Sequence, residues 1–377
     1  LVALVVEGEQ AEEMMSGVEG IVVLDKTPFY AEMGGQVADH GVITCGDAKF
    51  EVADVQKNKG GKYMHTGKVV SGSFKLGDTV TLKVDEKNHM ATCRNHSATH
   101  LLQKALREVL GTHVEQAGSF QDAGRTRFDF SHFQAMTREE LQKVEDMVNE
   151  KIQEGLEVRT DVMTLEEAKK SGAMALFGEK YGAEVRVVRM GDFSTELCGG
   201  THVKNTLQIG QFKILSETGV AAGVRRIEAL TGDNVRKYYE NLEHEMLAAA
   251  ELVKATPATL KEHIQSLQKE VKELRSENEA LKSKEAQNAL GNVMDSVVEI
   301  KGVKFLAAHV SGVDMNELRN LGDDLKTKLG EGVILLISDK DGKVSMVAMA
   351  TDGAVKSGAH AGNLIKQIAP IVGGGGG

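Results

Sequence analysis

A helical segment without glycine divides the chain. The 377 residues include 41 glycines, yet none lies from Asp233 through Leu290, where Glu, Lys, Leu and Ala dominate. The apolar positions step by 4, 3, 4, 3 and 7 residues, at Leu260, Ile264, Leu267, Val271, Leu274 and Leu281. Asn278 takes the core position between the last two, and one polar core residue can fix the register of a coiled coil. This heptad seam predicts an antiparallel helical hairpin or a short dimer contact. The alternative is one amphipathic helix lying on its own domain.

The part before this segment changes from a strand period to a helical period. Alternating apolar residues separated by glycines, as in 20–24, 42–44 and 78–84, predict a small, strongly bent β unit over the first 85 residues. From about Asn95 the apolar residues follow the period of a helix that ends at Gly111.

Later patterns complete an α+β fold class. A second helix fits 138–154, and strands fit 184–189 and 211–217. The tail alternates strand, helix, strand, strand and helix, over 304–310, 316–329, 332–338, 344–350 and 363–371. We therefore expect four segments, a β-rich part, a second α+β part, a helical linker and a small α/β domain, over 1–85, 86–238, 239–292 and 293–377.

The two ends of the sequence predict a piece of a longer protein. The chain begins with Leu1 in place of Met, and it closes on five glycines, Gly373 to Gly377. No Lys-Ser or Lys-Thr follows these glycines, as a P-loop requires, so a flexible end of a shortened domain is the better interpretation.

Charge, apolar runs and cysteines narrow the class of protein. A net charge of −10 restricts any nucleic-acid contact to local patches. The candidates are Arg125/Arg127, Lys204, Arg225/Arg226, Lys301/Lys304 and Lys326/Lys328, and solvated surface residues are the alternative for each. No apolar run reaches the roughly 18 residues of a membrane span. Three cysteines, Cys45, Cys93 and Cys198, are too few for a disulfide framework, so a cytoplasmic protein is expected.

Two short segments each carry metal-ligand residues four positions apart. His96 and His100 lie on the predicted helix, where positions i and i+4 share a face. Cys198 and His202 flank Gly-Gly-Thr, and the two glycines favour a loop over a helix. Three imidazoles and one thiolate are ligands that suit zinc, whereas magnesium and calcium prefer oxygen ligands. The sequence therefore predicts a zinc site formed by these four residues.

Several alternatives at this site stay open. A helical His pair alone is more often incidental, and the second motif is what favours a metal. His89 and Cys93 share the stripe of His96 and are further candidate ligands, although Cys93 and Cys45 fit better as small packed residues. The spacing does not separate a closed structural zinc from an open catalytic one. No Glu follows the first histidine as in HExxH, so no general base is identified.

Four motifs occur in a fixed order within residues 20–235. They read Thr27-Pro-Phe-Tyr-Ala-Glu-Met-Gly-Gly-Gln36, Arg94-Asn-His-Ser-Ala-Thr-His-Leu-Leu102, Gly111-Thr-His-Val-Glu-Gln116 and Cys198-Gly-Gly-Thr-His202. Together they resemble the editing domain of alanyl-tRNA synthetases. The heptad segment and the tail are similar to the C-terminal region of that family, including its DHH-associated domain, so the resemblance covers essentially the whole chain.

The resemblance implies roles for particular residues. By position, the zinc-site residues are His96, His100, Cys198 and His202. Thr99 and Gln116 are implied to line the editing pocket, and Thr27 to hydrogen-bond a serine hydroxyl. Gly34 and Gly35 are implied to let the acceptor end approach the backbone, and Arg225 and Arg226, from the basic patches, are further candidate substrate contacts. Without the family, Thr27 and Gln116 would be interpreted as ordinary turn and loop residues.

The resemblance also implies a reaction, the hydrolysis of Ser-tRNA(Ala) and Gly-tRNA(Ala). An alanine pocket cannot exclude glycine, and an added hydroxyl is rejected only about a hundredfold, so a second site that hydrolyses the wrong ester is needed. Zinc would position or polarise that ester, with water as the nucleophile. The implied partners are the acceptor end and elbow of tRNA(Ala), and a second copy of the chain through the coiled coil and C-terminal region.

Because the ATP- and alanine-binding part of the family would lie upstream of Leu1, no aminoacylation is expected of this chain. Three other functions compete with the editing fragment. They are a free-standing Ser-tRNA(Ala) deacylase, a non-catalytic tRNA-binding module with a structural zinc, and a coiled-coil assembly protein.

Overall fold

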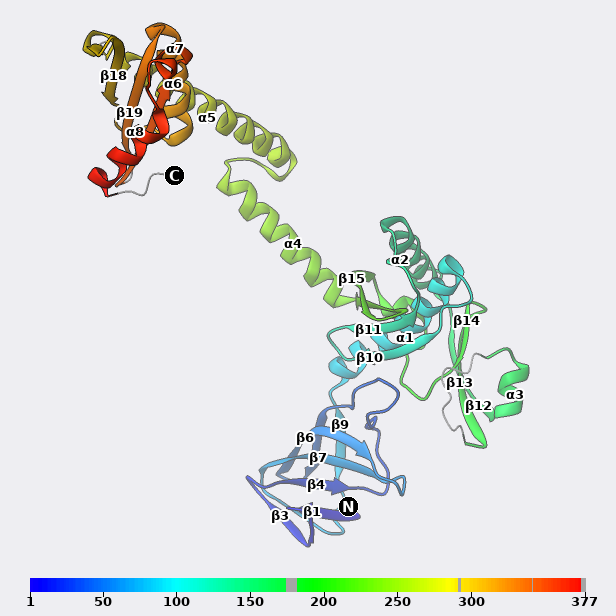
Figure 1. Ribbon diagram of the computed structural model, residues 1–377. Coiled ribbons are helices and arrows are strands. Elements are labelled where there is room, and N and C mark those ends of the chain that lie inside the picture. The colour runs from blue at the N-terminus through cyan, green and yellow to red at the C-terminus, as the bar shows by residue number, and fades with distance from the viewer. Residues whose placement is uncertain (174–181, 291–292, 341, 374–377) are drawn as a thin grey trace. The chain divides into compact units, whose positions relative to one another are not determined.

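The computed structural model describes residues 1–173, 182–290, 293–340 and 342–373, and the α+β fold class is confirmed there. The chain divides into two compact units, Leu1–Glu245 and Met246–Gly377 (Figure 1). Most of the terminal glycine run, Gly374 to Gly377, lies outside the described residues. Among the described helices, none has the length and apolar character needed to cross a membrane.

The N-terminal part of the first unit is an antiparallel sheet of seven strands. Their order is β2-β1-β4-β7-β6-β5-β9. The bounds are β1 Ala3–Val6, β2 Glu9–Ala11, β4 Glu19–Val23, β5 Gly41–Cys45, β6 Ala48–Lys57, β7 Tyr63–Ser71 and β9 Thr81–Val84. A separate antiparallel pair joins β3 (Glu13–Met15) to β8 (Ser73–Lys75).

Alternate residues of these strands fill one apolar core. Phe50 and Phe74 are fully buried and meet edge to face, with ring centroids 6.3 Å apart. The register of β6 shifts twice against β7, and such bulges bend a strand. The bent β unit predicted from the alternating, glycine-rich sequence therefore has a physical basis in β6.

Helix α1 (Glu86–Leu110) is the central element of the rest of the first unit. Asp85 caps its start by accepting a hydrogen bond from the Asn88 N–H at 3.1 Å, and Gly111 ends it with a φ of 115°. The helix begins before Asn95, where the apolar period predicted its start. The first turns carry mostly polar, incompletely buried residues, so no apolar stripe marks them in the sequence.

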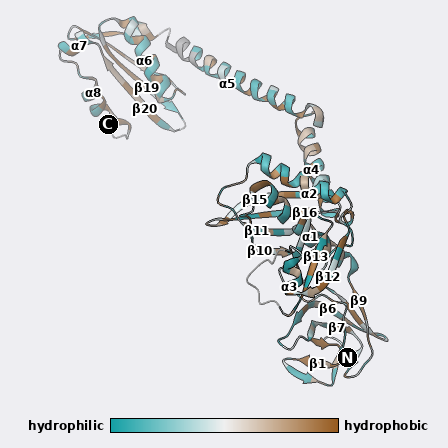
Figure 2. Cartoon of the chain, turned by 90° about the vertical axis from the view of Figure 1, so that its right-hand side faces the viewer, coloured by the Kyte–Doolittle hydropathy of each residue, from teal (hydrophilic) through white to brown (hydrophobic). Residues whose placement is uncertain are grey.

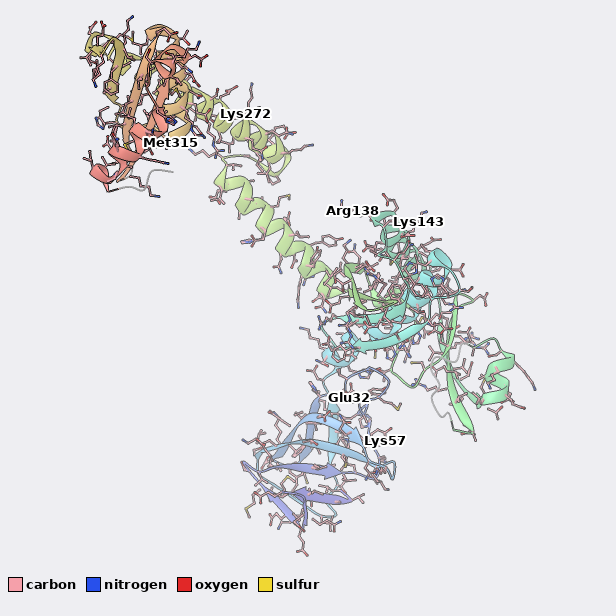
Figure 3. The ribbon with its side chains drawn as sticks, in the orientation of Figure 1. Glu32, Lys57, Arg138, Lys143, Lys272 and Met315 are labelled. Atoms are coloured by element: carbon pink, nitrogen blue, oxygen red, sulfur yellow. The ribbon has the colours of Figure 1, made fainter. Side chains whose placement is uncertain are left out.

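An antiparallel sheet and a second helix pack against α1. The sheet has the order β10-β11-β16-β15, with bounds β10 Gln116–Gln121, β11 Thr126–Ser131, β15 Phe212–Ala221 and β16 Val224–Thr231. Helix α2 (Arg138–Gln153) begins with a capping box between Thr137 and Glu140. It buries Val144, Val148 and Ile152 in the shared core. Its Arg138 and Lys143 are exposed (Figure 3).

A third sheet carries the loop of the second predicted metal motif. Its antiparallel order is β12-β13-β14, with bounds β12 Val158–Thr164, β13 Glu184–Met190 and β14 Ser194–Leu197. Cys198 directly follows β14, so this strand fixes where the motif begins. The short helix α3 (Leu165–Lys170) packs on this sheet, and the 3-10 helix η1 (Thr206–Ile209) packs against α1 and α2. Helix α4 (Asp233–Leu252) follows β16.

The second unit contains a long helix and a four-stranded sheet of order β17-β18-β19-β20. The strands are β17 Val298–Ile300, β18 Val303–His309, β19 Gly332–Lys340 and β20 Lys343–Ala350. The helices are η2 Pro257–Thr259, α5 Leu260–Leu290, η3 Val293–Ser296, α6 Met315–Leu329, α7 Asp352–Lys356, α8 Ala361–Ile368 and η4 Ala369–Val372. The predicted order strand, helix, strand, strand, helix is confirmed, and α6 supplies the crossover between the parallel strands β18 and β19. The sequence analysis missed β17 and α7, which are too short to show a period.

The heptad seam of α5 is exposed to solvent. Ile264, Leu267, Val271, Leu274 and Leu281 are 41–55% exposed. Hydrophilic residues dominate much of the helix surface, and Lys272 extends from it (Figures 2 and 3). One amphipathic helix lying on its own domain would bury these apolar side chains, so their exposure disfavours that alternative.

Candidate metal centre

The side chains of His96, His100, Cys198 and His202 converge on one point. One donor atom from each residue lies within 4.8 Å of the other three. The Sγ atom of Cys198 is 3.3 Å from Nε2 of His96 and 3.3 Å from Nε2 of His202. Zinc bonds of about 2.3 Å to sulfur and 2.0 Å to nitrogen place tetrahedral donors about 3.5 Å apart. The donor spacing therefore fits a single tetrahedral ion.

Helix α1 and the loop after β14 supply two donors each. His96 and His100 are 5–6% exposed, and their rings stack with centroids 5.4 Å apart, one helical turn from each other. Cys198 and His202 belong to irregular backbone, as the Gly-Gly sequence predicts. A Cβ atom on Gly200 would overlap the His96 ring. Glycine at this position therefore lets the loop lie directly against the helix.

Each histidine is oriented through its second ring nitrogen. Nδ1 of His96 is 2.7 Å from Oε1 of Gln36, and Nδ1 of His202 is 3.3 Å from the Ser97 hydroxyl oxygen. Nδ1 of His100 pairs with the buried carboxylate of Glu196. With Nδ1 carrying the proton in each ring, all three Nε2 lone pairs are directed at the cluster.

Two further properties of the cluster fit a bound metal. Nε2 of His100 is buried and has no hydrogen-bond partner among the described residues. Burial alone would raise the pKa of Cys198, but His96, His202 and His100 together lower it well below its usual value. The thiolate is the form of cysteine that binds metals. The residue types and protonation states of this donor set therefore suit a metal such as zinc.

The two other shifted groups of the cluster differ in direction. Burial lowers the pKa of His202 to about 3, although Cys198 opposes the effect. Burial also acts to lower the pKa of His100, but Glu196 and Cys198 outweigh it, so this pKa is raised. Both shifts have the Cys198 thiolate among their causes, and the Glu196 carboxylate contributes to the shift of His100.

A cavity of about 260 Å³ adjoins the cluster. Its wall includes His96, His100 and Cys198 together with Gly34, Thr99, Gln116 and Arg186. The structure thus brings three of the residues implied by the resemblance next to the donors. Thr27, Gly35, Arg225 and Arg226 are not part of this wall.

A tight turn connects the N-terminal β unit to the cavity. Gly34 and Gly35 have φ values of 62° and 90°, which a two-residue turn between Met33 and Gln36 requires. A Cβ atom on Gly35 would overlap the carbonyl of Ser119, which also lines the cavity. The two glycines therefore serve the turn and the close approach of the chain to β10.

Thr99 and Gln116 reach the cavity in different ways. The Thr99 hydroxyl donates to the Asn95 carbonyl at 2.9 Å and pairs with the Thr126 hydroxyl at 2.7 Å, so it is already engaged inside the fold. Gln116 is half-buried at the start of β10, beside a shift in register against β11. Bulges of this kind turn a side chain away from its regular direction.

Thr27 forms a hydrogen-bonded pair with a buried histidine. Nδ1 of His65 lies 3.0 Å from the Val22 carbonyl, so this nitrogen is the donor, and burial lowers the pKa of His65. Nε2 of the neutral ring is then an acceptor, and it lies 2.8 Å from the Thr27 hydroxyl. The hydroxyl proton of Thr27 is therefore engaged. Its oxygen already accepts a hydrogen bond from the Phe29 N–H at 3.1 Å, which leaves one further lone pair as an acceptor.

Arg225 and Arg226 are engaged in ion pairs on the sheet. Arg226 binds Asp129 through two contacts of 2.7 Å, and Arg225 binds Glu217. Partnered guanidinium groups contribute less to attracting phosphate than free ones would.

The sequence analysis missed several residues around the donors. Gln36 ends a quoted motif and Glu196 lies two residues before Cys198, but only the fold shows their contacts with His96 and His100. Arg186 on β13 donates to the carbonyls of Gly199 and Gly200, which holds the cysteine loop. His89 and Cys93 do not join the donor cluster. They contact each other at 3.4 Å, and His89 binds Asp39.

Three family models match separate parts of the chain. Residues 1–88 match the model described as tRNA synthetases class II (A). Residues 185–228, which include Cys198 and His202, match the Threonyl and Alanyl tRNA synthetase second additional domain. Residues 302–377 match the DHHA1 domain.

Curated relatives match the chain over nearly its whole length. An alanine–tRNA ligase 1 of Lachnoclostridium phytofermentans is 61% identical over 99% of this chain and 42% of the relative. Alanine–tRNA ligases of Pelotomaculum thermopropionicum and Acetivibrio thermocellus are 50% and 49% identical over 98% and 99% of this chain, again with 42% of each relative covered. The chain thus spans less than half the length of these relatives. Together with the three family-model matches, these relatives show that the chain belongs to the alanyl-tRNA synthetase family.

Proposed function

We propose that this chain hydrolyses the ester of tRNA(Ala) mischarged with serine or glycine. The observation that carries the proposal is the convergence of His96, His100, Cys198 and His202 beside a cavity of about 260 Å³. A bound zinc would polarise the ester carbonyl or orient the substrate, with water as the nucleophile. A closed site with all four donors on the metal is typical of structural zinc. A tRNA-binding module with a structural zinc is therefore the second candidate.

The chain's own residues would orient the substrate around the donors. Gly34 presents backbone without a side chain at the cavity, which suits the approach of a terminal ribose. Gln116 offers an amide, with both donor and acceptor groups, at the same wall. Arg186 is a cationic side chain of the wall that suits a nearby phosphate, while its guanidinium also holds the cysteine loop.

Serine would be distinguished from alanine by a hydrogen bond to its hydroxyl. Because the Thr27 proton is engaged by His65, the remaining capacity of Thr27 is to accept. A serine hydroxyl donating to Thr27 would meet this requirement, whereas alanine has no such donor. This role for Thr27 is carried by the resemblance, and the neutral state of His65 supplies its physical reason.

Membership in the alanyl-tRNA synthetase family also suggests roles for the second unit and for the whole protein. We infer that the protein containing this chain attaches alanine to tRNA(Ala) with ATP. The DHHA1 match and the exposed α5 seam suggest that the second unit contacts the tRNA elbow or a second copy of the chain.

Deacylation assays with the purified chain test the proposal. Ser-tRNA(Ala), Gly-tRNA(Ala) and Ala-tRNA(Ala) are incubated with the zinc-loaded chain, and with the chain after treatment with a chelator. We expect rapid loss of serine and glycine, slow loss of alanine, and a strong decrease in rate after the metal is removed. Zinc and tRNA binding without hydrolysis would favour the structural-zinc module.

A separate comparison distinguishes the fragment from a free-standing deacylase. If the gene encodes an alanine-activating domain on the same chain, the proposed activity is editing in cis. If it does not, the same chemistry acts in trans.

A further inference from the structure

Gln36 is at the centre of a buried polar network that reaches one metal donor. Its side chain is fully buried, and it enters the site from the Gly34-Gly35 turn of the N-terminal β unit. Oε1 of Gln36 is 2.8 Å from the backbone N–H of Thr201 and 2.7 Å from Nδ1 of His96. Nε2 of Gln36 donates to the Thr201 hydroxyl at 2.7 Å.

The backbone N–H of Thr201 determines the orientation of the Gln36 amide. An N–H is always a donor, so the atom of Gln36 that faces it must be the carbonyl oxygen. The same oxygen faces Nδ1 of His96, which must then carry the ring proton. Nε2 of His96 is left with a free lone pair, 3.3 Å from Sγ of Cys198. The Gln36 amide therefore selects the ring form of His96 that can bind a metal.

A second series of contacts holds the Thr201 side of this arrangement. The Cys93 thiol donates to the Thr201 hydroxyl oxygen at 3.1 Å, and its sulfur lies 3.4 Å from Nε2 of His89. Nδ1 of His89 binds the buried Asp39 at 2.7 Å. His89 and Cys93, which the sequence pattern made candidate ligands, thus support the loop between the two donors Cys198 and His202.

We propose that Gln36 is a positioning residue for the metal site, so that the N-terminal β unit directly sets metal affinity. The proposal rests on the proposed binding of zinc by the four donors and extends it to a residue outside the donor set. Gln36 acts through His96 and the Thr201 loop. Groups that hold a ligating histidine in this way typically change metal affinity about 10- to 100-fold when removed.

The decisive test separates the acceptor of Gln36 from its donor. Gln36→Leu removes both, whereas Gln36→Glu keeps an acceptor for His96 and for the Thr201 N–H and loses only the donor to the Thr201 hydroxyl. Zinc affinity of the full chain is measured by competition with a chromophoric chelator. The electronic spectrum of the cobalt(II)-substituted chain reports the geometry of the donors. We expect Gln36→Leu to weaken zinc binding about 10- to 100-fold and to shift the cobalt bands, and Gln36→Glu to stay within about tenfold of wild type.

A matched control separates positioning from general stability. Gln103→Leu replaces another buried glutamine of the first unit. Gln103 is 1% exposed and lies on α1, and its side chain is not part of the hydrogen-bond network around His96. It is expected to leave zinc affinity and the cobalt spectrum unchanged even if the melting temperature falls. If Gln36→Leu does not fold, Gln36→Asn withdraws the acceptor from His96 with the amide retained, and the same loss is expected.

The outcomes distinguish this inference from the proposed function. Wild-type zinc affinity and an unchanged cobalt spectrum in Gln36→Leu would overturn the positioning role while leaving deacylation by the wild-type chain intact. A wild-type chain that binds zinc but hydrolyses no ester would overturn the function, and the affinities of the Gln36 variants would still decide the inference. A wild-type chain that binds no zinc would overturn both.

Discussion

Helices α1 and α5 carry similar sequence patterns in opposite surroundings. On α1, His96 and His100 are spaced by four residues and are 5–6% exposed, and both contact residues from distant parts of the first unit. On α5, Leu267, Val271 and Leu274 are spaced by four and three, and they are 43–55% exposed. The spacing predicts correctly which residues share a face in both helices. It does not predict what covers that face.

The two helices differ in where the residues that contact each face come from. The donors on α1 are completed by a loop about a hundred residues later in the same chain, at Cys198 and His202. The apolar residues of α5 are exposed, and we propose a second copy of the chain as their partner, with the predicted helical hairpin within the chain as the alternative. The following predictions test this contrast, beginning with the largest expected effect.

Removing a donor from the α1 cluster should have the largest effect. Cys198→Ala deletes the thiolate that faces all three imidazoles, so zinc affinity should fall by more than about 100-fold, and deacylation should fall with it. Zinc content by atomic absorption and hydrolysis of Ser-tRNA(Ala) measure both. Cys45→Ala, a free cysteine on β5 away from the cluster, is the control and should retain zinc. Full zinc and full activity in Cys198→Ala would show that the four residues are not the metal site.

Charges in the α5 seam should have the next largest effect, on self-association alone. The double variant Leu267→Asp/Leu274→Asp places carboxylates in the contact with a second copy, and unpaired charge is costly to desolvate. We expect self-association, measured by analytical ultracentrifugation, to weaken on the order of 100-fold while zinc content and deacylation stay unchanged.

Lys272→Asp controls for the change in net charge, because it lies on the same helix and is exposed. Equal self-association of the wild type and the double variant would mean that no second copy covers the seam. Parallel loss of deacylation would mean that the two units are not independent.

The sequence predicted those elements whose apolar periods are regular enough to recognise. Helices α2 and α6 and strands β13, β18 and β19 all begin and end within a few residues of their expected bounds. The start of α1 was missed because capping by Asp85, rather than an apolar stripe, determines it. Strand β17 has three residues, all exposed, and so carries no pattern of burial.

At the site, the donor residues were predictable and the residues that orient them were not. His96, His100, Cys198 and His202 are recognisable from residue type and spacing. The amide of Gln36 and the carboxylate of Glu196 are ordinary polar residues until the fold places them against ring nitrogens. Such contacts depend on tertiary distance, which spacing along the chain does not contain.

A smaller effect is expected from Thr27, which is not part of the cavity wall. Thr27→Val keeps the shape of the side chain and removes the oxygen that we propose accepts the serine hydroxyl. An unpaired hydroxyl in a closed site costs about 1–3 kcal/mol, so the preference for Ser-tRNA(Ala) over Ala-tRNA(Ala) should shrink about tenfold or more, with zinc retained. The ratio of kcat/KM for the two substrates is the measurement. An unchanged ratio would remove Thr27 from serine recognition.

The smallest effect is expected at His89, on the same helix as the donors but only partly buried, with 26% of its side chain exposed. Hydrogen bonds to Asp39 and Cys93 raise its pKa to about 10 from the usual 6.5, although burial opposes them. Because the folded pKa lies above the unfolded one, the stabilisation is complete below pH 6.5 and is lost as the pH rises through about 10. His89→Gln should therefore lower the free energy of unfolding by about 1–2 kcal/mol at pH 6, and by little above pH 10. Urea unfolding of the wild type and the variant across this pH range measures the difference in their free energies of unfolding. Titrating groups that both proteins share cancel in this difference. A difference in unfolding free energy that does not change with pH would mean that the His89–Asp39 pair acts through packing and not through charge.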